Sequence, residues 1–288
     1  MVKVNLGEAD PHGTGERNHA WPKLHFDFED KPFPEARGGN CQMNIRNKTL
    51  PIVLAIVPWS CLTAECQAPR LPVYEVVRTA TPIKVDGKLD DLAWTKARGV
   101  GDFVNNSDGS PSQYKTEAKL LYDDHFLYFS FRCADDNIWA TLKRRDEHLW
   151  EEEVMEVFLQ ADPHQPSYIE LEVNPLGTIL DIYLLDVRKP LHYESWNSEK
   201  LQWGVQVFGT VDGKGGDREW TCEIGLPLED IVTAPHLPPQ PGDRWHLNLY
   251  RGERLPAPAE LAWSPTFKND FHVPSRFGEI VFANREVH

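Results

Sequence analysis

The chain has 288 residues, of which 41% are hydrophobic and 26% charged, a composition typical of a globular protein with a hydrophobic core. The formal net charge is −14, and no cluster of lysine and arginine offsets it, which argues against nucleic acid or an anionic membrane surface as a partner. No apolar run reaches the roughly 18–20 residues of a membrane-spanning helix, so we do not expect a transmembrane protein.

A short apolar run near the N-terminus has the anatomy of a secretory signal peptide. Two basic residues follow Met43, residues 50–57 are mostly apolar, and small residues up to Ala68 offer cleavage sites. The other interpretation of this run is a buried strand or short helix. With cleavage, the protein is secreted or periplasmic. The predicted divisions are an unstructured or mis-assigned upstream segment over 1–42, a signal peptide over 43–68 and one domain over 69–288.

Strand-like segments follow one another along this domain. Residues 74–78 alternate and are predicted to form an edge strand. The later strands are predicted at 115–122 and 125–133 (a hairpin), 152–160, 168–174 and 178–185 (a hairpin), 201–211 and 219–226 (a pair), 244–251 and 277–282. Short helical turns are expected near 91–94 and 227–231. No helical segment of ten residues separates the strands, which predicts an all-β fold, an antiparallel sandwich or jelly roll, over parallel β-α-β units.

Two cysteines, Cys133 and Cys222, remain after residue 68, and both lie in apolar strand-like runs. Two cysteines in an exported chain can form a disulfide, and two buried free thiols fit these positions equally well. The sequence leaves both interpretations open.

Polar side chains interrupt the apolar faces of two predicted strands. Glu156 shares a face with Val154 and Phe158, where an unpartnered carboxylate is costly to bury. Trp150 lies just before this strand, where we expect a loop, and a loop tryptophan has less reason to be in the core than a strand tryptophan.

The next strand has one apolar face, and its other face carries Tyr168, Glu170, Glu172 and Asn174. For Glu170 a solvated outer face is the favoured interpretation. Glu156, Glu172 and Asn174 together are also consistent with a polar cleft.

These residue types suit sugar binding. A pyranose ring has an apolar face of C–H groups that packs on an aromatic ring, and its hydroxyl groups need donors and acceptors such as carboxylates and amides.

The order of motifs resembles the family 9 carbohydrate-binding modules, which have a DOMON-like β-sandwich fold and occur in xylanases and in many exported bacterial proteins. The resemblance covers about residues 75–283. The matching segments include IKVDGKLDDLAW at 83–94, 118–124, 127–136, RDEHLWEEEVMEVFL at 145–159, 168–177, 220–228 and PSRFGEIVF at 274–282.

The resemblance implies that two aromatic residues sandwich a sugar. Trp150 matches the first platform, and either Trp263 or Phe271 supplies the second. Glu156 matches an acceptor for sugar hydroxyls.

Asn174 and Glu172 match polar positions of the following strand. The xylanase modules have a basic residue where this chain has Glu172, which leaves the sugar and the chain-end preference open.

The resemblance also implies structural calcium. Turn carboxylates that would suffice as ligands are Asp123, Asp124, Asp135 and Asp136, although turns are rich in aspartate for other reasons.

Three other functions are compatible with parts of the sequence. Glu156 and Glu172 could be the acid and base of a glycoside hydrolase, but the sequence shows no catalytic motif beyond this pair. Some DOMON-like sandwiches bind haem for electron transfer, for which Met155, His148 and His192 are the available ligands. A surface used only for protein contact is the third. We predict non-catalytic binding of a poly- or oligosaccharide, with glycoside hydrolases as partners in polysaccharide breakdown.

Overall fold

The computed structural model describes residues 69–188, 191–193 and 196–287; the predicted signal peptide and upstream segment lie outside these ranges. The described part contains thirteen strands and four short 3₁₀ turns, and none of its helices is long and apolar enough to cross a membrane. The strands are β1 (Val73–Thr79), β2 (Val104–Asn105), β3 (Thr116–Tyr122), β4 (Phe126–Ala134), β5 (Val154–Gln160), β6 (Tyr168–Val173), β7 (Ile179–Asp186), β8 (Leu191–Tyr193), β9 (Gln202–Phe208), β10 (Glu219–Pro227), β11 (Arg244–Glu253), β12 (Ala259–Ala262) and β13 (Gly278–Val287). The turns are η1 (Leu92–Thr95), η2 (Leu149–Glu151), η3 (Leu228–Asp230) and η4 (Pro274–Arg276).

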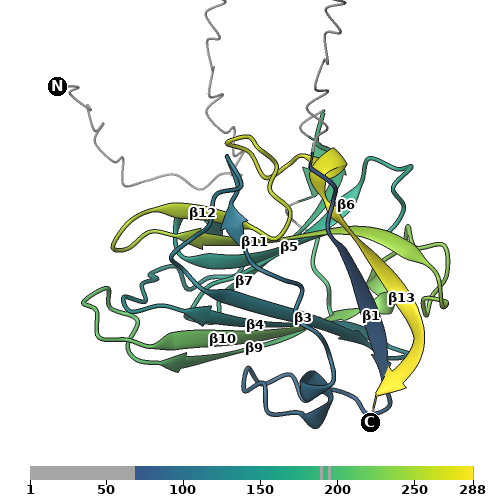
Figure 1. The fold of residues 1–288 in the computed structure, drawn as a ribbon, viewed down its shortest axis with the longest axis horizontal. Coiled ribbons are helices and arrows are strands. Elements are labelled where there is room, and N and C mark those ends of the chain that lie inside the picture. Colours follow the sequence, from purple (N-terminus) through teal and green to yellow (C-terminus); the bar gives the residue numbers. More distant parts are fainter. Residues whose placement is uncertain (1–68, 189–190, 194–195, 288) are drawn as a thin grey trace, which may run out of the picture. The chain divides into compact units, whose positions relative to one another are not determined.

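The strands form one curled sheet in the order β8-β7-β6-β5-β11-β13-β1-β3-β4-β10-β9, with β12 paired to β11 and β2. Figure 1 shows β5, β6, β11 and β12 in one layer and β3, β4, β9 and β10 in the other, while β1 and β13 run along one side between the layers. This arrangement confirms the predicted all-β sandwich.

Local pairing agrees with the sequence pattern. The predicted pairs appear as the antiparallel strands β3/β4, β6/β7 and β9/β10. The prediction of an edge strand over 74–78 is wrong, because β1 lies inside the sheet and runs parallel to both β13 and β3. Local alternation cannot reveal this, since the neighbour β13 comes from the far end of the chain.

The main hydrophobic core lies between the two layers and includes Trp220, Trp245 and Met155. A second apolar cluster lies on the opposite face of β5–β7 and β11 and includes Phe158 and Tyr250. Both faces of β5 and β6 are therefore covered, and every residue of these two strands is buried.

Cys133 and Cys222 are free, buried thiols, which decides between the two interpretations of this pair. Burial raises the pKa of the Cys133 thiol to about 12, so the reactive thiolate is disfavoured at neutral pH.

Candidate functional site

A cavity of about 590 Å³ opens over the outer face of β5, β6 and β7. Its volume is within the ~300–1,000 Å³ typical of small-molecule sites. The residues that line it are Asn106, His148, Trp150, Glu156, Phe158, Glu170, Glu172, Ile182, Leu184, Asp186, Val187, Glu260, Asn269, Asp270, Phe271 and His272.

Three carboxyl groups lie together at the cavity. Glu156 and Glu172 are directly opposite each other on the paired strands β5 and β6, and Glu170 is two residues from Glu172 on the same face. One oxygen of each carboxylate lies within 4.8 Å of one oxygen of each of the others. The predicted solvated position of Glu170 is wrong, because this face lies under the chain after β12, where His272 Nδ1 is 4.0 Å from Glu170 Oε2.

Burial and mutual repulsion disfavour the charged forms of this cluster. The pKa of Glu156 is raised well above its usual value, first by burial and then by Glu170 and Glu260, while Arg254 lowers it. The pKa of Glu172 is raised likewise by burial and by Glu156 and Glu170. Both carboxylate oxygens of Glu172 are buried and neither makes a hydrogen bond with acceptable geometry.

Trp150 forms an aromatic wall of the cavity. It lies in η2, its side chain is 39% exposed, and its ring stacks on the His148 ring at a centroid distance of 4.3 Å. The Arg254 guanidinium donates hydrogen bonds to the backbone carbonyls of Trp150 and Glu151 and forms a 3.0 Å ion pair with Glu260. These contacts hold η2, which carries Trp150, against the end of β11 and against β12.

Phe271 is the second aromatic residue at the cavity. Its ring stacks on the Tyr250 ring, with centroids 4.0 Å apart and an interplanar angle of 8°. The Tyr250 hydroxyl donates a 2.8 Å hydrogen bond to the Phe271 carbonyl, which fixes the backbone there.

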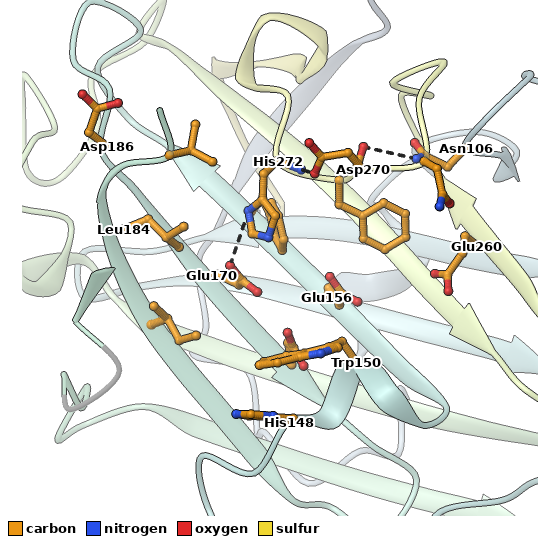
Figure 2. A pocket seen from close by; sticks show the side chains of 16 residues that line it. Asn106, His148, Trp150, Glu156, Glu170, Leu184, Asp186, Glu260, Asp270 and His272 are labelled. Atoms are coloured by element: carbon orange, nitrogen blue, oxygen red, sulfur yellow. Dashed lines mark hydrogen bonds and ion pairs between the residues drawn. The ribbon is translucent and has the colours of Figure 1, made fainter. Parts of the chain in front are cut away.

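Polar residues that the sequence analysis missed complete the rim. In Figure 2, His272 and Asp270 lie across the carboxyl cluster from Trp150, with Asn106 beside Asp270. Asn106 Nδ2 donates to the Lys268 carbonyl at 2.9 Å, and Tyr168 Oη lies 2.6 Å from His272 Nδ1. Asp270 and His272 flank Phe271, the predicted aromatic platform, so the polar neighbours of that residue are the sequence signal that could have found them.

Asn174 and Trp263 do not line the cavity. The Asn174 amide donates to the Leu142 carbonyl and accepts from the Thr178 backbone N–H at 2.9 Å each, so it shapes the β6/β7 turn. Trp263 is packed in the main core, and its Nε1 donates to the Val100 carbonyl at 2.9 Å. Neither position gives geometric support to the predicted direct contact with sugar.

The residues considered for haem are occupied otherwise where they are described. Met155 fills the main core, as the sequence analysis preferred, and His148 is stacked on Trp150. The side chain of His192 lies outside the described residues.

A second carboxyl cluster lies at the ends of β4 and β11 and the start of β5. Asp135, Glu153 and Glu253 are buried, and oxygens of all three lie within 4.8 Å of one another. The buried Arg251 guanidinium forms an ion pair with Glu253 and lies 3.7 Å from Asp135 Oδ2. Three ionised carboxylates and one guanidinium carry a formal charge of about −2, which one divalent cation would neutralise.

This second cluster fits a calcium ion. Asp135 Oδ2, Glu153 Oε1 and Glu253 Oε2 are all buried and make no hydrogen bond to a described residue. Carboxylate oxygens are the ligands that calcium prefers. Without such a cation, burial raises the pKa of Glu153 to about 8 and that of Glu253 to about 7.

Of the four turn aspartates considered for calcium, Asp135 joins this cluster. Asp123 instead accepts hydrogen bonds from the His125 backbone and the Tyr128 hydroxyl. Asp124 forms a 2.7 Å ion pair with Arg78.

The sequence model of carbohydrate-binding family 9 matches residues 95–282. No curated protein matches the chain. A solved structure of a Bacteroides uniformis ATCC 8492 protein with an inferred carbohydrate-binding role is similar at a TM-score of 0.62 and 16% identity, covering 74% of this chain and 100% of that one.

Two structures of a family 9 carbohydrate-binding module from Caldicellulosiruptor kristjanssonii are also similar, each over 74% of this chain. The complex with cellotriose has a TM-score of 0.53 and 15% identity over 94% of its chain. The complex with glucose has a TM-score of 0.52 and 14% identity over 98% of its chain. At these identities the likeness shows a shared fold.

Proposed function

The chain belongs to carbohydrate-binding family 9, and on that premise we propose that it binds a poly- or oligosaccharide non-covalently in the cavity over β5, β6 and β7. The observation that carries the proposal is the half-exposed Trp150 ring beside the carboxyl groups of Glu156 and Glu172. The ring offers an apolar platform for the C–H face of a sugar, and the carboxyl groups accept hydrogen bonds from its hydroxyls. The cellotriose and glucose complexes of the structural relatives support this chemistry.

Titration of the full chain with a panel of oligosaccharides, followed by tryptophan fluorescence, tests the proposal. We expect saturable binding that Trp150→Ala weakens at least tenfold, about 1.4 kcal/mol, because the stacking platform is lost. Phe208→Ala is the matched control, since Phe208 is 40% exposed on β9 and does not line the cavity. Equal losses in the two variants, or no binding across the panel, would contradict the proposed site.

We propose binding without hydrolysis. A glycoside hydrolase needs two carboxyl groups in different states, one protonated as acid and one ionised as nucleophile or base. Burial raises the pKa of both Glu156 and Glu172, so their surroundings do not mark one as the acid and the other as the nucleophile. Membership of a carbohydrate-binding family supports binding over hydrolysis. A reducing-sugar assay on the same oligosaccharides, with Glu156→Gln as a control, detects any hydrolysis.

We also propose that calcium occupies the cluster of Asp135, Glu153 and Glu253. Three buried oxygens without hydrogen-bond partners support this. The ion would join the ends of β4 and β11 to the start of β5 and would neutralise the excess buried charge.

We further propose that the protein is exported and assists glycoside hydrolases on polysaccharides. The signal-peptide anatomy of 43–68 supports export, and β1 begins shortly after Ala68. N-terminal sequencing of the exported protein tests it, with a start at or near residue 69 expected.

A further inference from the structure

The ionisable side chains that line the cavity are mostly acidic. Glu156, Glu170, Glu172, Asp186, Glu260 and Asp270 line it, and no lysine or arginine does so among the described residues. Arg188 pairs with Asp186 and Arg254 pairs with Glu260, both from outside the lining. The described lining therefore has no lysine or arginine beside the cluster of Glu156, Glu170 and Glu172. Glu172 is wholly buried with both oxygens lacking a hydrogen-bond partner of acceptable geometry, and Glu156 is 2% exposed. Burying the two Glu172 oxygens without hydrogen-bond donors costs free energy, so this position favours a ligand that supplies donors and positive charge.

The carboxyl groups lie close enough together for one ammonium ion to contact all three. A primary ammonium has three N–H donors and no acceptor, and its charge-assisted hydrogen bonds to carboxylates are about 2.8 Å long. Three acceptors in tetrahedral directions around such a nitrogen lie about 4.6 Å apart at that bond length. Oxygens of Glu156, Glu170 and Glu172 all lie within 4.8 Å of one another.

We propose that the ligand is an amino sugar of the glucosamine class, whose free ammonium group binds Glu156, Glu170 and Glu172 while its ring stacks on Trp150. This inference rests on the proposed function and narrows its ligand class. N-acetylation removes the charge and two of the three N–H donors, and a neutral sugar brings only hydroxyl donors to the carboxyl groups.

A metal ion is the competing occupant of the same carboxyl cluster. Calcium takes six to eight oxygen ligands, whereas Trp150, Phe158, Ile182, Leu184 and Phe271 supply none to this part of the cavity. An apolar wall above three carboxyl groups fits a ligand with both a C–H face and a cationic group. The geometry therefore favours the amino sugar.

Calorimetric titration of the full chain at neutral pH with three trisaccharides of matched length tests the proposal. The probes are the glucosamine trimer, its fully N-acetylated form and cellotriose. We expect the glucosamine trimer to bind at least tenfold more tightly than the other two, with or without added calcium. Equal or tighter binding of cellotriose overturns the amine assignment and leaves the proposed carbohydrate site intact. Binding of none of the three overturns the proposed function as well.

Isosteric variants test whether these carboxyl groups bind the ammonium group of the sugar. Glu156→Gln and Glu172→Gln keep the shape of the side chain and remove its charge. We expect each to weaken the glucosamine trimer at least tenfold and cellotriose by a clearly smaller factor, because the amide oxygen still accepts a hydrogen bond from a hydroxyl. Glu151→Gln is the control, because Glu151 is an exposed carboxylate outside the cavity lining. Equal losses of affinity for both sugars overturn the amino-sugar assignment. Cellotriose binding that appears only with calcium and disappears in Glu172→Gln also overturns it, because a metal ion would then occupy the carboxyl cluster. Thermal unfolding of each variant confirms that it is folded.

Discussion

Two aromatic side chains near the end of the chain have different surroundings that predict different roles. Trp263 is 4% exposed, donates to the Val100 carbonyl and packs against Gly278, where an added Cβ would lie 2.5 Å from the indole ring. Phe271 lines the cavity and stacks on Tyr250. We expect Phe271→Ala to weaken oligosaccharide binding at least tenfold with a smaller effect on stability. Trp263→Phe should instead lower the free energy of unfolding by about 1–3 kcal/mol, since it removes a buried hydrogen bond and ring volume.

Titration and thermal unfolding of both variants separate these roles. Loss of binding in Trp263→Phe with unchanged stability would reverse the assignment of the second platform.

Glu172 makes the empty domain less stable as the pH rises. Its folded-state pKa is raised well above that of a free glutamate, so between the two values the folded state holds a proton that the unfolded state has released. Stability is therefore fully present below the unfolded pKa of about 4.3 and is lost as pH rises through the folded pKa. Glu172→Gln removes this loss, and we expect it to raise the unfolding free energy near pH 8 by about 1–3 kcal/mol, the usual cost of an unsatisfied buried polar group.

Melting temperatures of the wild type, Glu172→Gln and the exposed control Glu151→Gln at pH 5 and pH 8 check this pH dependence. The wild type should lose more stability than Glu172→Gln between the two values. A variant less stable than the wild type at pH 8 would mean that the ionised carboxylate has a stabilising partner.

At the scale of single elements, alternation in the sequence predicted which side chains share a strand face. It placed Glu156 with Val154 and Phe158, and Glu170 with Glu172, as the structure does. It could not predict that the second face is covered, because the cover comes from residues around 263–277, about one hundred positions later in the chain. Glu170 was therefore predicted to be solvated although it is 4% exposed.

The second carboxyl cluster lies where three strand ends meet, so the calcium ion that we propose there should stabilise them. If calcium is present at about 100 times its Kd, binding to the folded state adds roughly 2.7 kcal/mol. For a domain of about 220 residues that corresponds to a rise of about 5–10 °C in Tm. We expect chelation with EDTA to reverse the rise and Glu153→Gln to abolish the response to calcium.

Asp124→Asn provides the matched control for the calcium experiment, since Asp124 lies in a turn and is paired with Arg78. Its response to calcium should equal that of the wild type. A calcium effect that persists in Glu153→Gln would place the ion elsewhere.

At the scale of the whole molecule, sequence patterns predicted the fold class and the local hairpins. They could not give the position of β1, whose parallel partners β13 and β3 are set by closure of the sheet. The cavity depends on the same long-range assembly, because its walls come from η2, β5–β7, β12 and the segment before η4. The sequence therefore predicted some of the aromatic and acidic residues of the cavity. It did not predict the polar residues at the rim, which are Asn106, Asp270 and His272.

The charge of the whole molecule predicts selection against acidic glycans. The net charge of −14 repels a polyanion at long range, and the exposed Asp270 at the rim of the cavity repels it at contact. We expect the galacturonic acid trimer to bind at least tenfold more weakly than cellotriose at low ionic strength. Salt screens exposed charges, so at about 0.5 M salt the difference should shrink. Asp270→Asn should reduce the difference at low salt, because it removes an exposed charge at the rim of the cavity. Equal binding of the acidic trimer and cellotriose at low salt would contradict the prediction.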